Sequence, residues 1–293
     1  MDKQVEQIAR VVPRSMVKTF GGIDFTHGFG RVLLQILPVV LVILVWWVVA
    51  VVMHVPRLYP TPVTVFNEFI GILGGKAPVG AASSYVHIGA TLYRLFIAFL
   101  LSFAIGVVIG LIVGRNKLLF NLFDNIGWIF LSVPAILWSF IFVVALGLTE
   151  VVPVVVLMSQ LAPQVALLTA EGAKATPADI LEMSASYKAT TWQKVKDVFL
   201  PHLIPYLVAS ARTSFSLGAK LVVIAEIVGF STGIGVMIKY WDDKVQVAPL
   251  VAWGLVLIVV ANAVEYAVFA TLERRVAKWR TGPQVTMKGG GVA

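Results

Sequence analysis

Cysteine is absent from the 293 residues, and charged residues are scarce. The lack of cysteine excludes disulfide frameworks, thiolate metal sites and cysteine nucleophiles. Only 13% of the residues are charged and 59% are hydrophobic, with a mean hydropathy of +0.91. Soluble domains typically contain about 25% charged and about 45–50% apolar residues. Because such a chain cannot cover itself with polar surface, the sequence predicts an integral membrane protein.

Motifs for nucleotide and metal chemistry are missing as well. The segment GILGGKA, which begins at Gly71, has neither the spacing nor the hydroxyl residue of a phosphate-binding P-loop. The histidines are far apart in the sequence and lack the spacing of metal ligands; they are His27, His54, His87 and His202. The paired acids Asp242 and Asp243 are expected in a solvated turn of an outer loop. The chain is therefore not expected to be an enzyme.

Long uncharged stretches predict six membrane-spanning helices, since a helix needs about 20 apolar residues to cross the hydrocarbon core. Five stretches are long enough, and they cover residues 32–56, 95–114, 125–149, 151–170 and 245–264. A sixth segment, residues 203–228, is apolar but contains Arg212, Lys220 and Glu226. The first stretch is too long for the core of a signal peptide, about 7–15 residues, so it is expected to remain as a helix.

The positions of lysine and arginine predict the orientation, because cytoplasmic loops hold an excess of them. With the N-terminus inside, 16 of the 23 basic residues lie in cytoplasmic segments and four in outer loops. Both termini are therefore expected in the cytoplasm. The organisation is a cytoplasmic segment (residues 1–31), a first helix with its outer loop (32–84), a core domain (85–280) and a cytoplasmic tail (281–293). This placement explains the net charge of +8 without nucleic acid.

The longest internal cytoplasmic loop, residues 171–201, predicts two short amphipathic helices. Helix-start signals come first from Thr176, Pro177 and Asp179, and then from Thr190 and Gln193 in capping-box spacing. The expected apolar stripes are Ile180, Met183 and Tyr187 in the first helix, and Trp192, Val195 and Phe199 in the second; Leu200-Pro201 is expected to end the loop. Such stripes either fold back on the bundle or lipid, or dock a soluble partner.

From Glu182 the chain reads EMSASYKATTWQKVKDVFLP, which resembles the EAA loop of ATP-binding-cassette (ABC) importer permeases. Residues 182, 198, 200 and 201 match that pattern in kind, whereas Met183 and Ser184 replace two alanines. Lys188 stands where the family has glycine. Because a left-handed backbone costs a non-glycine residue about 1–2 kcal/mol, Lys188 is expected to end the helix without one or to extend it.

The resemblance extends over roughly residues 85–280. The segments TLYRLFIAFLLSFAIGVVIGLIVGR, FLSVPAILWSFIFVVALG and AEIVGFSTGIGVMI resemble the first and second core helices and the end of the fifth. The ending ERRVAKWR looks most like the nitrate/sulfonate/taurine branch of the family. The resemblance implies an all-α polytopic membrane protein with six transmembrane helices and the type I ABC importer permease fold.

The same resemblance implies a homodimer in the bacterial inner membrane. It would carry a small, anionic solute, such as a sulfonate, taurine, nitrate or an aromatic carboxylate, delivered by a periplasmic or surface-tethered binding protein. Two cytoplasmic ATPase subunits would bind ATP and Mg²⁺, so no cofactor is expected on this chain. The loop would be their coupling element, and the residues expected at the contact are Asp179, Glu182, Met183, Ser184, Ala185, Tyr187 and Lys188.

Polar residues within the spans are candidates for the translocation pathway. A charge at mid-membrane costs about 2.5–3.5 kcal/mol, so it should face protein or water. One hypothesis is that Lys220, with Arg212, Ser214 and Ser216, gives the pathway a positive field that favours an anion. The alternative is a structural pair of Lys220 or Arg212 with Glu226 or Glu265. The full set of pathway candidates is Ser132, Trp138, Ser139, Arg212, Ser216, Lys220 and Glu226, although the serines could equally serve helix packing.

Other features are expected to be structural. Gly106, Gly110 and Gly114 recur every four residues, which lets a neighbouring helix approach closely. Arg94 is expected to extend to the lipid headgroups, and the prolines expected to interrupt core helices are Pro134, Pro153 and Pro163. One alternative to the importer remains open, a stand-alone ion-coupled secondary transporter or channel that would use the charged residues Arg212, Lys220, Glu226 and Glu265 as relays. A membrane-embedded enzyme would need paired acids or a nucleophile and base at membrane depth, and the sequence has neither.

Overall fold

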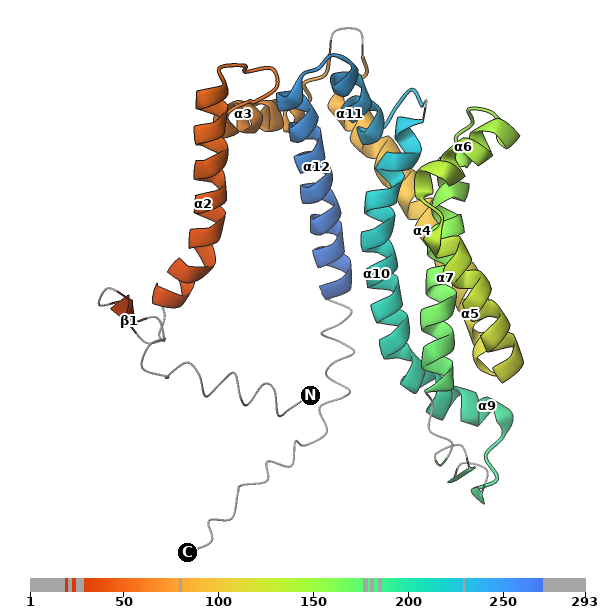
Figure 1. Ribbon diagram of the computed structural model, residues 1–293. Coiled ribbons are helices and arrows are strands. Elements are labelled where there is room, and N and C mark those ends of the chain that lie inside the picture. The colour runs from red at the N-terminus through yellow and green to blue at the C-terminus, as the bar shows by residue number, and fades with distance from the viewer. Residues whose placement is uncertain are drawn as a thin grey trace, which may run out of the picture. The chain divides into compact units, whose positions relative to one another are not determined.

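The computed structural model describes residues 19–20, 23–24, 29–78, 81–175, 179, 182–183, 186–228 and 230–270, and nearly all of them are helical (Figure 1). A short antiparallel pair, β1 (Thr19–Phe20) and β2 (Ile23–Asp24), precedes the helices. The chain divides into two compact units, Met1–Asn67 and Glu68–Ala293.

The first unit contains α2 (Phe29–Met53) and the first half of α3 (Pro62–Leu73), as far as Asn67. The part of α2 from Ile36 to Met53 is long and apolar enough to cross a membrane. Most of its side chains are exposed, including Leu41 and Val48, as expected for a helix that faces lipid. This helix corresponds to the first predicted span.

The second unit holds four more helices that are long and apolar enough to cross a membrane, as the sequence predicted. They are α4 (Ser84–Gly114), α7 (Val151–Lys174), α10 (Leu200–Ile227) and α12 (Val247–Glu265), which continues into the π-helical segment η2 (Tyr266–Ala270). α4 begins at Ser84 rather than at residue 95, because Arg94 lies inside the helix and does not mark its end. The short helix α11 (Ile234–Asp243) ends with exposed Asp242 and Asp243, so these acids are helical and not in a loop turn.

The remaining predicted span, residues 125–149, is broken. α5 (Lys117–Ser132) and α6 (Ala135–Leu146) meet at an angle of 88°, and the total reaches six spans if this pair counts as one. Proline disfavours a helical backbone at the residue before it, and Val133 is extended, with φ −72° and ψ 123°, in front of Pro134. By contrast, α7 continues through Pro153 in its first turn and through Pro163.

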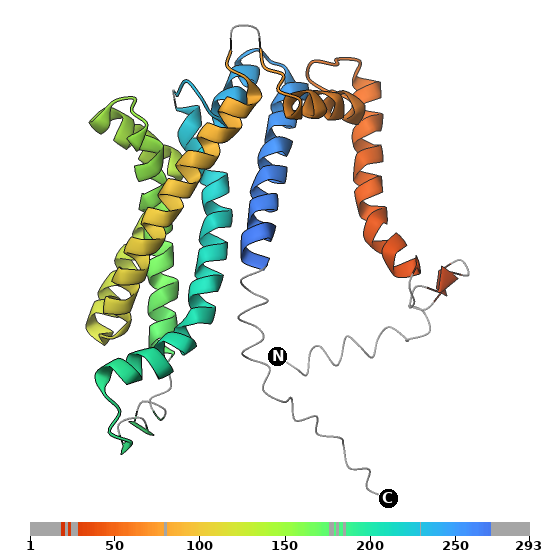
Figure 2. The ribbon, with the colours of Figure 1, turned by 180° about the vertical axis from the view of Figure 1, so that it is seen from behind.

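The core of the second unit forms where α4, α7 and α10 pack together, an arrangement visible from both sides (Figures 1 and 2). Its buried apolar side chains include Leu95, Leu157, Leu161, Phe215 and Val222. The three glycines of α4 face α7 at very short range. A Cβ atom on Gly106, Gly110 or Gly114 would lie 2.8, 2.5 or 2.7 Å from a carbonyl oxygen of α7. The α4–α7 contact therefore requires glycine at these positions.

We expect Gly110→Ala to destabilise the protein, although alanine is favoured over glycine in a helix by about 1 kcal/mol. The added methyl would meet the carbonyl oxygen of Ala166 and the side chain of Thr169, and overpacking of this kind costs about 1–3 kcal/mol. Gly89→Ala is the matched control, because Gly89 lies in the same helix and a Cβ there meets nothing within 4 Å. Thermal unfolding of the purified protein should separate the two variants; equal midpoints would contradict the close approach.

Candidate functional site

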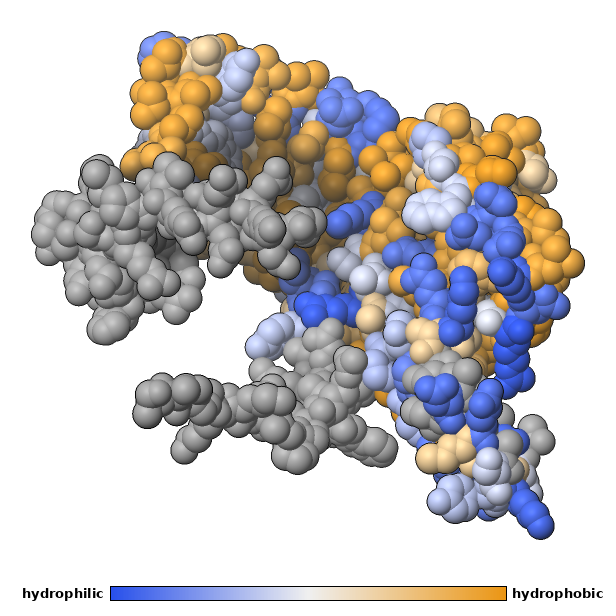
Figure 3. Space-filling model, turned by 60° about the horizontal axis from the view of Figure 1, so that its bottom comes forward, coloured by the Kyte–Doolittle hydropathy of each residue, from blue (hydrophilic) through white to orange (hydrophobic). Residues whose placement is uncertain are grey.

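The loop that is predicted to contact the ATPase subunits, residues 171–201 (called the coupling loop below), exposes large apolar side chains. Met183 is 57% exposed, Tyr187 81% and Trp192 72%. Asp179, Glu182 and Lys188 are exposed as well. An oblique view from below shows that the described residues of this projecting part are mostly hydrophilic, with a few apolar ones among them (Figure 3). Ser184 and Ala185, together with Thr176, Pro177 and Ile180, lie outside the described residues.

A helical turn in the loop ends at Lys188, and the prediction for this residue was wrong. The Met183 carbonyl accepts a hydrogen bond from the Tyr187 N–H at 3.2 Å, and the Glu182 carbonyl accepts one from Ser186 Oγ at 3.2 Å. Lys188 then has a φ of 55°, in the left-handed region. The chain must change direction within the two residues that separate this turn from the next helix start. This change of direction requires a left-handed residue at position 188, although that conformation costs a non-glycine residue about 1–2 kcal/mol.

The second helix start is the capping box that the sequence predicted. The Thr190 N–H donates to Gln193 Oε1 at 2.8 Å, and the Gln193 N–H donates to Thr190 Oγ1 at 3.3 Å. The helix continues through α9 (Thr191–Gln193) and the π-helical η1 (Lys194–Phe199) directly into α10. The expected end at Leu200-Pro201 is therefore wrong: Pro201 lies in the first turn of α10, where proline is tolerated.

Cation–π contacts connect the segment around this loop to the helix bundle. The Arg115 guanidinium, just after α4, lies 5.2 Å from the centre of the Phe199 ring in η1. The Lys174 ammonium, at the end of α7, lies 4.3 Å from the Phe120 ring in α5. Such contacts contribute about 0.5–1 kcal/mol at exposed sites. The loop thus has an exposed apolar surface and a base fixed to three helices.

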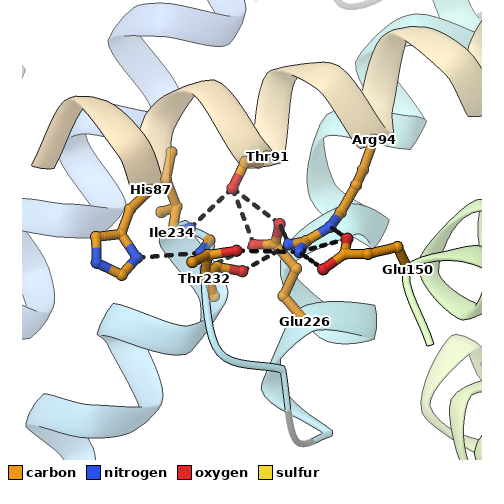
Figure 4. Close-up of polar contacts among 9 residues, drawn as sticks. His87, Thr91, Arg94, Glu150, Glu226, Thr232 and Ile234 are labelled. Carbon is orange, nitrogen blue, oxygen red and sulfur yellow. Dashed lines mark hydrogen bonds and ion pairs between the residues drawn. The ribbon is translucent and has the colours of Figure 1, made fainter. Parts of the chain in front are cut away.

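A buried ion network lies at the opposite end of α10 (Figure 4). Arg94 is 1% exposed, and its Nη1 donates to Glu226 Oε1 at 2.8 Å. Its Nε and Nη2 donate to the two carboxylate oxygens of Glu150 at 2.7 and 2.8 Å. The expectation that Arg94 extends to headgroups was wrong, because two carboxylates from other parts of the chain hold it inside. A sequence signal existed: Arg94 lies one residue before a predicted span, and Glu226 is an opposite charge within another.

Glu226 is completely buried, so it does not line an open pathway in this structure. Its carboxylate accepts hydrogen bonds from Thr91 Oγ1 at 2.9 Å and from the Gly235 N–H at 2.9 Å. Arg94 also donates to the Thr232 carbonyl at 2.6 Å. The network therefore joins α4, α10, the residue before α7 and the turn that begins α11. Gly233 in this turn has a φ of 136°, and a Cβ there would collide with the Glu226 carboxylate.

The other two charged residues of α10 differ: Arg212 forms an ion pair, and Lys220 forms none with the residues that the structure describes. Arg212 Nε lies 2.9 Å from Glu265 Oε1, which is the structural alternative that the sequence offered for Arg212. Lys220 is exposed and, in the part of the chain that the structure describes, has no carboxylate within 4.0 Å. It lines a small pocket of about 100 Å³ together with Ser216 and Glu265.

The pathway candidates before α7 make local contacts. Ser132 Oγ donates to the Trp128 carbonyl at 2.7 Å, and Ser139 Oγ donates to the Ala135 carbonyl at 3.0 Å. The Trp138 ring stacks on Phe130 and Phe142, with centroids 5.3 and 5.5 Å away. Both serine hydroxyls therefore donate to a backbone carbonyl of their own helix, four residues earlier. Ser132, Trp138 and Ser139 are not among the described residues that line the small pocket at Lys220.

Comparison with known proteins identifies the chain. The family model for the binding-protein-dependent transport system inner membrane component matches residues 106–278, more than half of the sequence. The chain belongs to this family. Its members include permease components of ABC importers, so the protein is a multi-pass membrane permease and not an enzyme.

Individual relatives agree with this family. The taurine transport system permease protein TauC of Escherichia coli (strain K12) is 23% identical over 250 residues, which cover 85% of this chain and 90% of TauC. The nitrate import permease protein NrtB of Synechocystis sp. (strain ATCC 27184 / PCC 6803 / Kazusa) is 26% identical over 157 residues, covering 54% of this chain and 56% of NrtB. An inward-facing structure of the MetNI methionine ABC transporter has the same fold, with a TM-score of 0.55 and 23% identity over 64% of this chain and 92% of that chain.

We expect Glu226→Ala to destabilise the permease by about 3–5 kcal/mol, the cost of removing one partner of a buried ion pair. Glu265→Ala is the matched control. It breaks the Arg212–Glu265 pair, in which the side chains are 47% and 20% exposed, and loss of an exposed pair costs about 0–1 kcal/mol. Thermal unfolding of both variants in the same detergent tests the difference. Comparable losses of stability in the two variants would show that the buried Arg94–Glu226 pair stabilises the permease no more than the Arg212–Glu265 pair does.

Proposed function

We propose that this chain is the permease subunit of an ATP-driven importer for a small anion. It works as a homodimer with two cytoplasmic ATPase subunits, which bind ATP and Mg²⁺, and with a binding protein on the outer side. Its location is the bacterial inner membrane, with both termini in the cytoplasm. The observation that carries the proposal is the exposed apolar surface of the coupling loop, on a segment that its sequence resemblance relates to the EAA loop.

The loop has the composition of a docking surface. Tyr187 and Met183 present apolar area to solvent beside the charges of Asp179, Glu182 and Lys188. Interfaces combine a buried apolar or aromatic centre with polar groups that set the orientation. The capping box and the Arg115–Phe199 contact hold the other side of this segment. A rigid base with an exposed aromatic tip suits transmission of force from a partner to α10.

The direction of the proposed transport follows from the charge distribution and the family. The excess of basic residues in this loop and in the other segments on its side supports a cytoplasmic position for it, where ATP is present. The chain has no P-loop spacing, so the ATP-binding site belongs to a partner. Membership of a binding-protein-dependent family favours this importer over a stand-alone ion-coupled transporter.

An anionic substrate is supported by the electrostatics of α10. Arg212 and Glu265 form a pair whose charges cancel, which leaves the positive charge of Lys220 at the small pocket. A local positive field raises the concentration of anions. The relatives named for taurine and nitrate transport act on small molecules that carry an anionic group. We therefore place Lys220 and Ser216 on the pathway wall and leave Glu226 out of it.

Tyr187→Ala should uncouple ATP hydrolysis from transport, because it removes the most exposed aromatic side chain of the docking surface. We expect stimulation of the ATPase by loaded binding protein to fall about tenfold or more, as for loss of an interface hot spot of about 2 kcal/mol. Tyr93→Ala is the control, since Tyr93 is 64% exposed but lies on α4. ATPase assays of the reconstituted complexes test this; wild-type stimulation in Tyr187→Ala would overturn the docking role.

Lys220→Met should lower uptake of an anionic substrate about tenfold or more, the loss expected when a charge-assisted contact of about 1.5–3 kcal/mol disappears. Lys117→Met, which removes an exposed lysine at the start of α5, is the control. The measurement is uptake of sulfonates and nitrate into proteoliposomes by complexes shown to be fully assembled. Unchanged uptake by Lys220→Met would place this residue outside the pathway.

A further inference from the structure

A larger pocket, of about 420 Å³, lies at the end of the second unit opposite the coupling loop. It is formed by the end of α3, the segment after it, α11 and the start of α12. Its volume falls in the range of about 300–1,000 Å³ that is typical of small-molecule sites. A single water molecule takes up about 30 Å³, so the pocket has room for a small organic molecule.

The rim of this outer pocket is positively charged. Lys76 Nζ lies 3.1 Å from Glu68 Oε2, so these two charges balance. Lys244 Nζ donates to the Tyr240 hydroxyl at 2.6 Å and lies 4.3 Å from the centre of the Tyr240 ring. Among the described residues, no carboxylate lies within 4.0 Å of Lys244. One lysine charge is therefore available to an anionic group.

The wall of the outer pocket is aromatic and apolar. Trp241 and Trp253 line it together with Ile72, Pro78 and Pro249. Trp253 and Ile72 are only 1% and 3% exposed, so the accessible part of the wall comes from the half-buried Trp241 and Pro78. The pocket thus combines a cation with an aromatic and apolar surface.

The turn that carries Lys244 to the rim is strained. Val245 has a φ of 54°, an uncommon conformation for a β-branched residue. Two backbone hydrogen bonds hold the turn, from the Val245 N–H to the Asp242 carbonyl and from the Gln246 N–H to the Trp241 carbonyl, at 2.8 and 3.0 Å. Strained residues persist where the surrounding structure fixes them, and they cluster at ligand sites. Lys244 and Gln246 flank Val245 in the sequence, and in this turn both line the pocket.

We infer that the outer pocket binds an organic anion with an apolar group, such as a sulfonate or carboxylate on a short chain or aromatic ring. The anionic group lies at Lys244, and the apolar group lies against the half-buried Trp241 and Pro78. An inorganic ion such as nitrate would leave most of this apolar wall in contact with water, so the pocket discriminates against it. This inference rests on the proposed function, and it narrows the substrate class from any small anion to organic anions.

The pocket also touches the buried ion network through one aromatic contact. The Trp253 ring packs edge-on against His87, with centroids 5.9 Å apart and planes at 77°. His87 Nδ1 accepts a hydrogen bond from the Gly233 N–H at 3.1 Å. Gly233 follows Thr232, which Arg94 holds. The lining of the outer pocket is therefore connected, through Trp253 and His87, to the turn that follows α10.

Equilibrium binding to the permease–ATPase complex in phosphatidylcholine nanodiscs, without ATP or binding protein, tests the inference. Benzenesulfonate is the probe and nitrate the comparator, with tryptophan fluorescence and calorimetry as readouts because two tryptophans line the pocket. We expect saturable binding of benzenesulfonate and at least tenfold weaker binding of nitrate. Lys244→Met should weaken benzenesulfonate binding about ten- to hundredfold, and Trp241→Phe should weaken it by a smaller factor.

Lys239→Met is the matched control, because Lys239 lies on α11, the helix directly before Lys244, and bonds to Asp243 outside the pocket. The affinity of this variant for benzenesulfonate should equal that of the wild type. Absence of saturable binding, equal affinities for nitrate and benzenesulfonate, or wild-type affinity in Lys244→Met would each overturn the inference. The Tyr187→Ala complex separates the two proposals. Unchanged benzenesulfonate binding in that variant supports the pocket whatever happens to ATPase coupling.

Discussion

A buried arginine can remain in an apolar bundle only if acceptors surround its N–H groups. Arg94 meets this condition with Glu150, Glu226 and Thr232, which come from three different parts of the chain. Two of these partners lie outside α4 and α10, so the network fixes where α7 and α11 begin. The turn before α11 in turn places His87 and Trp253. The ion network and the outer pocket are thus connected through His87 and Trp253.

The two ends of the second unit differ in which side chains they bury and which they expose. At the end that holds Arg94, Arg94 and Glu226 are buried and bonded to each other, which makes breaking that contact costly. At the coupling loop, apolar groups are exposed and only the base is fixed, by the capping box and the Arg115–Phe199 contact. Between them, the close approach of α4 and α7 at the three glycines gives a rigid connection. A rigid core with one open, apolar end is a suitable arrangement for a membrane subunit driven by a partner.

Features that depend on neighbouring residues could be predicted. The capping box at Thr190 requires only the two residues that form it, and the glycine repeat of α4 requires only helical periodicity. Lys188 shows the limit of this reasoning. Its side chain predicted a right-handed or extended backbone, but the path between two helices decided the φ angle. The break at Pro134 was foreseen as an interruption, whereas the 88° bend depends on how α5 and α6 pack against α7.

The sequence by itself determined the class of protein, the approximate spans and the family, because hydropathy, charge placement and the EAA-like spacing are properties of consecutive residues. Only the tertiary structure decided which charges meet. Glu226 lies 132 residues from Arg94, and it pairs with that residue instead of with Lys220 or Arg212 on its own helix. The physical reason is that a buried charge takes the partner that helix packing brings within hydrogen-bond distance, and sequence separation contains no information about that distance.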